Sequence, residues 1–466
     1  MSDALTPTPP VEPPPPTEQD GVADELAEAS AFDEALNLGA AEPEVTPEAE
    51  EDNRWREAAR EILSGRLAVA FGAVILAFLV GSLLIVFTNS NVQAAMGGDG
   101  NFFSAAGSAI IDAYDALIRG SIWNWQGRNF NAQILPLTRT LRHATPLIAA
   151  GLGVAVTFKA GLFNIGGRGQ MIFGAIGSGW LAFGLRDAGI PFPLHLLICI
   201  IGGMLAGALW GALAGFLKAK TGAHEVIVTI MLNFVAYHLL QYLLATPGLM
   251  QDPARFDPIT PPIPGSARLP ALYSDLNWGF VISLLLVAAC WWLLNRSTAG
   301  FAFRAVGENP RAAKVAGINV ARTTVIVFAV SGALIGFAGA HQVLDPASPG
   351  GFGDTIDGGI GFDAITVALL GGSSPVGVLF AGILFGAFRA GGVPMQAQVG
   401  VPAEIATIIQ ILIVMFIAAP PLVRAIFRLP QPSQAAKAKK DARKTQKTIT
   451  KAARLTAKNN EEVVSE

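Results

Sequence analysis

The sequence contains little charge and almost no cysteine. Only 14% of its 466 residues are Asp, Glu, Lys or Arg, and 52% are hydrophobic, whereas about a quarter of the residues of an ordinary soluble domain are charged. This composition excludes a typical soluble domain and indicates a membrane protein. The two cysteines, Cys199 and Cys290, both lie inside apolar runs, so neither a disulfide framework nor a Cys-x-x-Cys metal site is available.

Motifs for bond chemistry are also missing. No G-x-x-x-x-G-K-[ST] loop occurs in the 466 residues, so the chain cannot hold ATP phosphates in the usual way. The five histidines are scattered, and they form neither a nucleophile, base and orienter triad nor a metal-ligand cluster. We therefore expect no catalytic residue, no metal site, no cofactor and no nucleic-acid partner.

The two ends of the chain differ from its middle. Residues 1–53 contain nine prolines and many acidic residues but no Lys or Arg, a composition that cannot bury enough apolar surface to offset chain entropy. We expect residues 1–60 to form a disordered, acidic, proline-rich tail. Residues 437–460 carry nine basic residues against one acid, so we expect 431–466 to form a basic tail that is attracted to the anionic cytoplasmic leaflet.

The middle of the chain, residues 61–430, is predicted to be an all-α membrane bundle of about ten spans. The charge-free run 67–87 is close to the roughly 20 residues that a helix needs to cross a bilayer. It is too long and too far from Met1 to be a cleaved signal peptide. The predicted spans are 67–87, 145–163, 169–185, 194–217, 226–244, 278–294, 323–344, 361–374, 376–391 and 403–427.

The distribution of Lys and Arg predicts the orientation of these spans. With the N-terminus inside, most of the basic residues in short loops fall on the cytoplasmic side, as the positive-inside rule requires. Both termini are then cytoplasmic, and the loops 88–143 and 251–270 are outside. The sequence therefore predicts a multi-pass protein of the cytoplasmic membrane.

Small residues recur on two of the predicted spans at four-residue spacing. This spacing lets helices approach closely in lipid, where packing drives their association. It predicts a compact bundle in which the few remaining polar positions line any cavity. The small residues are Gly203, Gly207, Gly211 and Gly215 on one span and Gly332, Gly336 and Ala340 on another.

Polar residues recur every four residues along the span 226–244. Each such step turns about 400° on a helix, so the residues form a slanted stripe down one side. Polar groups at membrane depth usually face the bundle interior or a water-filled path, but Thr, Asn and Gln also join helices by hydrogen bonds. Both interpretations stay open for this stripe. It consists of Glu225, Thr229, Asn233, Tyr237 and Gln241, with His238 beside it.

Two glycine-rich segments interrupt the apolar runs. They are GLFNIGGRGQ at 161–170 and GFDAITVALLGGSSPVGV at 361–378. Irregular backbone is tolerated in a membrane only where it is buried in protein or lines a cavity, and interrupted segments in both halves of a chain point to a transport path. The predicted pathway residues are Asn164, Gln170, Glu225, Thr229, Asn233, Tyr237 and Asp363.

The predicted cytoplasmic loop 296–322 contains the signals of a short helix. Asn309 suits the N-cap, Pro310 suits the first helical position and Gly317 suits the residue past the end. The segment PRAAKVA, residues 310–316, is therefore predicted to be a helix outside the bilayer that docks into a groove of a partner. The residues predicted to serve this contact are Glu308, Asn309, Arg311, Ala312, Ala313, Lys314 and Gly317.

Four motifs resemble, in order, those of permease subunits of bacterial ABC importers for nucleosides and simple sugars. They are residues 161–175, 224–233, 307–322 together with 331–340, and 361–386. The resemblance covers about 140–427, and its NIGxxGQ and TIMLN forms are most similar to guanosine-type permeases. The family commonly has Ala-Glu where this chain has Gly167 and Arg168, so a basic residue stands at an acidic position. The long acidic N-terminus is absent from the family core.

The resemblance implies a type II-like ABC importer permease that conducts nucleosides and is not itself an enzyme. It implies separate ATPase subunits that use ATP and pull on the helix 310–316. It also implies a second, related permease subunit, an extracytoplasmic substrate-binding lipoprotein and contact with membrane lipids.

Other functions stay open from the sequence. They are an ABC permease for a monosaccharide or a purine base, an ion-driven secondary transporter, and a membrane scaffold that transports nothing. An ion-driven transporter needs ionisable groups well inside several spans. The only candidates in the sequence are Glu225, Asp363, Arg389 and Glu404.

Overall fold

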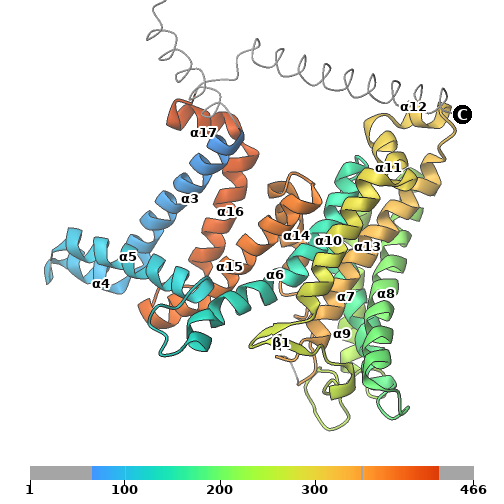
Figure 1. Ribbon diagram of the computed structural model, residues 1–466, viewed down its shortest axis with the longest axis horizontal. Coiled ribbons are helices and arrows are strands. Elements are labelled where there is room, and N and C mark those ends of the chain that lie inside the picture. Colours follow the sequence, from blue (N-terminus) through green and yellow to red (C-terminus); the bar gives the residue numbers. More distant parts are fainter. Residues whose placement is uncertain (1–65, 100, 348–349, 430–466) are drawn as a thin grey trace, which may run out of the picture. The chain divides into compact units, whose positions relative to one another are not determined.

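The computed structural model describes residues 66–99, 101–347 and 350–429 (Figure 1). The tails predicted at 1–60 and 431–466 lie outside the described residues. In the described part, helices alternate with short connections, and one small hairpin joins β1 (Ala271–Tyr273) and β2 (Leu276–Asn277) in antiparallel pairing.

The N-terminal helices extend further than the sequence indicates. α3 (Arg66–Thr88) confirms the first predicted span, but the predicted loop 88–143 contains α4 (Ser90–Ala94), η1 (Ala95–Asp99), α5 (Phe102–Ser121) and the beginning of α6 (Phe130–Lys159). The prediction of a loop there is wrong. Asn89, Asn101 and Asn129 each cap the helix that follows by accepting hydrogen bonds from its first N–H groups, so the polar residues of this region begin helices.

Two long helices lie at the centre of the helices that pack together. α6 and α13 (Val320–Leu344) are largely buried, and α13 packs along α8 (Phe192–Thr221) and α7 (Gly167–Gly184) (Figure 1). The predicted glycine spacing explains the closest contact. A Cβ atom on Gly207 would lie 2.4 Å from the carbonyl oxygen of Gly332, and one on Gly211 would lie 2.2 Å from that of Phe328. Only glycine permits this approach, which confirms the predicted packing of these two helices.

The remaining elements complete the bundle. α9 (Glu225–Ala245) follows α8, and η2 (Gly265–Ala267) and the hairpin lead to α10 (Gly279–Arg296). α11 (Thr298–Glu308) and α12 (Pro310–Val315) separate α10 from α13. The C-terminal part contains α14 (Ile360–Leu370), α15 (Pro375–Val399), α16 (Glu404–Ala418) and α17 (Pro420–Phe427), and α16 packs on α3.

The predicted count of about ten spans is not confirmed by the described residues. Among the described residues, seven helices are long and apolar enough to cross a membrane, namely α3, α6, α8, α9, α10, α13 and α15. An eighth results if α16 and α17, which are bent by 93°, count as one span. All ten predicted segments contain helix, but α14 has only 11 residues and α7 begins with the polar sequence GRGQ. The chain is thus a polytopic helical membrane protein, and ten spans are not confirmed.

Candidate functional site

The break between α6 and α7 is held by buried amide side chains. Asn164 accepts a hydrogen bond from the N–H of Gly166 at 2.9 Å through Oδ1. Its Nδ2 donates to Gln170 Oε1 at 3.0 Å and to Ser331 Oγ at 2.9 Å. Asn164 and Gln170 are almost completely buried, so these side chains satisfy one another and tie the break to α13.

Asn233 of α9 holds the same break from its other side. Its Oδ1 accepts from the N–H of Gly169 at 2.8 Å, and its Nδ2 donates to the carbonyl of Ile165 at 2.9 Å. The side chain thus occupies backbone groups that lie outside regular helix bonding, a need that is strict at membrane depth. Three of the predicted pathway residues therefore come together, but their amide groups are bonded within the chain.

Glu225 and Thr229 lie at the first turns of α9. Glu225 forms an ion pair with Lys218 of α8 at 2.6 Å, which closes the turn between the two helices. Thr229 is buried, and its hydroxyl donates to the carbonyl of Glu225 at 2.8 Å. These two predicted pathway residues bond locally at this helix end.

The second break brings two helix N-termini together. Gly358 and Gly359 have φ values of 48° and 77°, and α14 begins directly after them. The backbone of Gly361 touches the beginning of α7, because a Cβ atom on Gly167 would lie 2.5 Å from the Gly361 carbonyl oxygen. The two glycine-rich segments identified in the sequence are therefore neighbours in the fold, and glycine is required at both sides of their contact.

Charged side chains gather beside this contact. Arg168 Nε lies 3.3 Å from Asp357 Oδ1, and its guanidinium carbon lies 4.7 Å from the centre of the Tyr237 ring. The Tyr237 hydroxyl donates to Asp354 Oδ2 at 3.2 Å and accepts from Gln241 Nε2 at 3.0 Å. Tyr237 of the predicted stripe therefore meets the glycine-rich segment 351–359, and Gln241 of the same stripe bonds Tyr237.

A second ion pair continues this group. Arg389 of α15 donates through Nη2 to Asp363 Oδ2 at 2.7 Å and to the carbonyl of Gly358 at 2.9 Å. Asp357 in turn accepts from the N–H of Gly359 at 3.2 Å, so segment 357–359 joins the two pairs. We call this set the polar belt. It consists of Arg168, Tyr237, Gln241, Asp354, Asp357, Asp363 and Arg389.

Three of the seven members of the polar belt were not predicted from the sequence. Tyr237, Gln241, Asp363 and Arg389 stood out as polar or ionisable positions of the predicted spans, whereas no role was predicted for Arg168, Asp354 or Asp357. The run GFGDTIDGG at 351–359 carries a usable signal, since it places two aspartates among glycines directly before an interrupted span. Within the described ranges, no group of three or more His, Cys, Asp or Glu side chains is placed to hold a metal ion.

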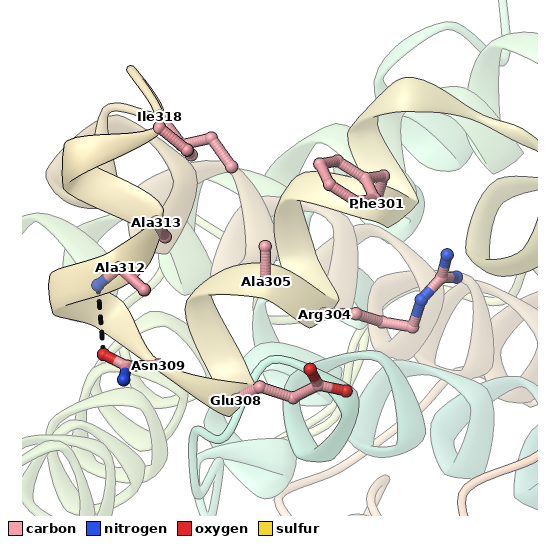
Figure 2. A pocket seen from close by; sticks show the side chains of 9 residues that line it. Phe301, Arg304, Ala305, Glu308, Asn309, Ala312, Ala313 and Ile318 are labelled. Atoms are coloured by element: carbon pink, nitrogen blue, oxygen red, sulfur yellow. Dashed lines mark hydrogen bonds between the residues drawn. The ribbon is translucent and has the colours of Figure 1, made fainter. Parts of the chain in front are cut away.

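The predicted short helix is present as α12. Asn309 is its N-cap and accepts from the N–H groups of Arg311 and Ala312 at 3.0 Å each. Gly317 has a φ of 83° just past the end. A groove of about 410 Å³ lies between α11 and α12, and Figure 2 shows the side chains that line it. These observations confirm the predicted capping and extent of the helix.

Ala313 has a different environment from the one predicted. Its side chain is 4% exposed, and it lines the groove with Ala305 and Ile318 (Figure 2). The chain itself already covers most of this residue, so a direct contact of Ala313 with a partner stays a prediction. Val315 is 89% exposed instead. Glu308, Arg311, Ala312, Lys314 and Gly317 are exposed as well.

Comparison with known proteins places the chain among permeases. Residues 137–418 match the family described as the branched-chain amino acid transport system / permease component. The chain is 36% identical to the guanosine ABC transporter permease protein NupP of Bacillus subtilis, over 69% of this chain and 89% of that protein. It is 33% identical to a glucose ABC transporter permease protein of Haloferax volcanii, over 70% and 85%. A further guanosine permease protein of Bacillus subtilis, NupQ, is 30% identical over 53% and 78%.

Proposed function

The chain belongs to the branched-chain amino acid transport system / permease component family, and on this premise we propose that it conducts nucleosides in an ATP-driven importer of the cytoplasmic membrane. The observation that carries the substrate class is the 36% identity to a guanosine permease over most of both proteins. The similarity to a glucose permease supports a monosaccharide as the second candidate. The protein supplies a passage and performs no bond chemistry, so ATP is used on a partner.

We infer that the partner ATPase docks on α12. The chain has no P-loop of its own, so it needs a partner that hydrolyses ATP. α12 presents the exposed apolar side chain of Val315 together with the positive charges of Arg311 and Lys314. α11 packs beside this helix, and Ala313 lies on the covered side of α12. A short helix that is capped at its start and braced by a neighbour can transmit a push without unwinding.

A second, related permease subunit is part of the proposal. Arg168 and Arg389 lie at the depth of the middle of the spans, and their side chains are 29% and 26% exposed. Charged groups at this depth do not face lipid but face the bundle interior or a water-filled cavity. A second subunit across the passage would supply that cover, and the two guanosine permeases of Bacillus subtilis that this chain resembles are consistent with such a pair.

The remaining features complete the assembly. We propose that both termini are cytoplasmic, that 1–60 and 431–466 are an acidic and a basic tail, and that an extracytoplasmic lipoprotein delivers substrate at the opposite end. The loop between α9 and α10 would face that lipoprotein, and the lipid tails would contact the outer helices. The polar belt is the one observation that favours an ion-driven mechanism. Both arginines of the belt are paired with aspartates, so neither is a free ionisable group.

The experiment measures uptake with the complete complex. The chain is expressed with its second permease, ATPase and lipoprotein from the same organism, in cells that lack their own nucleoside and glucose importers. Labelled guanosine should accumulate, and ATP depletion should abolish its uptake while collapse of the ion gradients at constant ATP should not. If the cells accumulate glucose and no guanosine, the substrate is a monosaccharide. If uptake stops when the ion gradients are collapsed, the mechanism is ion-driven.

A further inference from the structure

The polar belt lies near the middle of two of the long apolar helices. Tyr237 is near the middle of α9 and Arg389 is near the middle of α15, and both helices are long and apolar enough to span. Arg168 enters at the same level from the first turn of α7. Ionisable residues at this depth are rare and costly, and they commonly mark the path of a substrate or ion.

Each ion pair of the belt leaves hydrogen-bonding atoms unused. Arg168 bonds Asp357 through Nε, and its η nitrogens donate to no residue in the described part of the chain. Arg389 uses only Nη2 within those residues. Since a guanidinium carries five N–H donors, both arginines keep donors, and the exposed quarter of each side chain makes them accessible.

The acceptors of the belt are also incompletely used. Asp354 and Asp363 each accept through Oδ2, from Tyr237 and Arg389, while their Oδ1 atoms accept from no described residue. The belt thus offers donors and acceptors side by side, and its three carboxylates and two guanidinium groups nearly balance in charge. An anion would meet the carboxylates, and a cation would meet the guanidinium groups.

A hydroxyl group suits such a site because it both donates and accepts. We propose that the polar belt is the specificity-determining site of the passage and binds adjacent hydroxyl groups of a neutral sugar moiety. Arg168 and Arg389 donate to the hydroxyl oxygens, and Asp354 and Asp363 accept from the hydroxyl hydrogens. This inference rests on the proposed function, and ribose in a nucleoside and a free hexose share the chemistry. Guanosine and glucose, the substrates named for two relatives, both carry adjacent hydroxyls.

Tyr237 positions the site without contributing to its selectivity directly. Its ring lies under the Arg168 guanidinium, and its hydroxyl holds Asp354. Gln241 fixes that hydroxyl by donating to it. The tyrosine therefore sets the separation of one donor and one acceptor, which a pair of adjacent hydroxyls requires.

The test uses conservative variants that keep the fold. Arg168→Lys retains the charge beside Asp357 but loses the forked donors, and Asp354→Asn breaks no ion pair. Uptake of guanosine and of 2′,3′-dideoxyguanosine is measured in the complete complex with the same lipoprotein. Both variants should lower guanosine uptake by about tenfold while dideoxyguanosine uptake changes little, because a site built for hydroxyls discriminates through them. Thr355→Ala, an exposed neighbour in the same segment, should behave as wild type.

Other outcomes overturn the proposal. If the variants lower the uptake of both compounds equally, or if they fail to assemble, the belt has a structural role and does not select hydroxyls. If the ratio of guanosine uptake to dideoxyguanosine uptake is the same in the variants as in the wild type, other residues determine the selectivity. A wild type that imports glucose and no guanosine refutes the proposed substrate class instead, and the ratio of glucose to 2-deoxyglucose uptake then tests the belt by itself.

Discussion

At the residue scale, the polar side chains of the spans differ in what their atoms already bond. The amides of Asn164, Gln170 and Asn233 spend their donors and acceptors on the helix break and on one another. The charged groups of the polar belt keep unused donors and acceptors. This difference matters inside a membrane, because a polar group without a protein partner has no water there with which to form a hydrogen bond. The first set therefore maintains the fold, and the second can receive a ligand.

Asn233→Leu should destabilise the assembled protein. The variant leaves the N–H of Gly169 and the carbonyl of Ile165 without their partner at a site that is 5% exposed. Each buried group left unsatisfied costs about 1–3 kcal/mol. We expect a lower midpoint of thermal unfolding for the purified complex and less protein in the membrane. Met231→Leu, at an exposed position of the same helix, is the matched control. An unchanged midpoint combined with lost uptake would assign Asn233 to the pathway.

Part of this site could be predicted from the sequence. Glycines and amides in an apolar run indicate a helix break, and the two breaks do meet at Gly167 and Gly361. The partners of Arg168 could not be predicted, since Asp357 is 189 residues away and a lone arginine gives no direction. The role of Asn233 was open for the same reason, because a stripe on one helix does not show which backbone it faces.

At the element scale, α12 packs against α11 on one side and leaves its other side exposed. Val315→Asp should separate the permease from its ATPase without unfolding it. The side chain is 89% exposed, so a charge there costs the isolated subunit little, whereas an unpaired charge buried in an interface costs several kcal/mol. We expect weak co-purification with the ATPase and loss of ATP-driven uptake. Val315→Thr, which has a similar shape and no charge, should retain most of both.

The buried neighbour provides the contrast. Ala313→Asp places a charge in the groove between α11 and α12, so it should unfold the helix pair, seen as rapid proteolysis at 298–317. If Val315→Asp instead keeps full ATPase binding and transport, α12 is a connector and the contact lies elsewhere.

Prediction of the elements succeeded where one physical rule dominates. Glycine at four-residue spacing admits close contact, and α8 and α13 meet through it. The cap residues Asn309 and Gly317 likewise predicted where α12 begins and ends. α5 was missed because charged residues interrupt its apolar sequence. They are Asp112, Asp115 and Arg119, of which the last two form an ion pair along the helix. Its small apolar face packs on α15 and α3, a tertiary effect that hydropathy does not detect.

At the scale of the whole molecule, helix length and hydropathy give different counts of spans. Ten apolar segments were predicted, yet α7 and α14 are helices that begin inside the bundle at its two breaks. The sequence of each reads as a short apolar run, but α14 has only 11 residues and α7 begins with the polar sequence GRGQ, so neither meets the length and hydropathy of a full crossing. Whether such a segment crosses the membrane depends on where the helix break lies. The position of the break depends on the side chains that bond its backbone.

The charges at the two ends of α10 predict the orientation of the bundle. The hairpin lies at one end and α11 and α12 at the other (Figure 1). Arg304, Arg311 and Lys314 at the α12 end form no ion pair with any described residue, whereas Arg139, Arg142 and Arg255 at the hairpin end pair with Asp275, Asp345 and Asp257. The short loop 296–322 carries five Lys or Arg residues against one acidic residue, Glu308, and such a loop favours the cytoplasmic side.

Labelling of introduced cysteines tests this orientation. Phe256 is fully exposed in the loop after α9, and Val315 is 89% exposed on α12, so Phe256→Cys and Val315→Cys present accessible thiols at opposite ends of α10. The native Cys199 and Cys290 are buried and give a low background. With the α12 end inside, a membrane-impermeant maleimide should label Phe256→Cys in intact cells and Val315→Cys only after permeabilisation. The unmodified chain should stay unlabelled in both conditions. Labelling of Val315→Cys in intact cells would invert the bundle, place α12 outside and remove it from reach of any cytoplasmic ATPase.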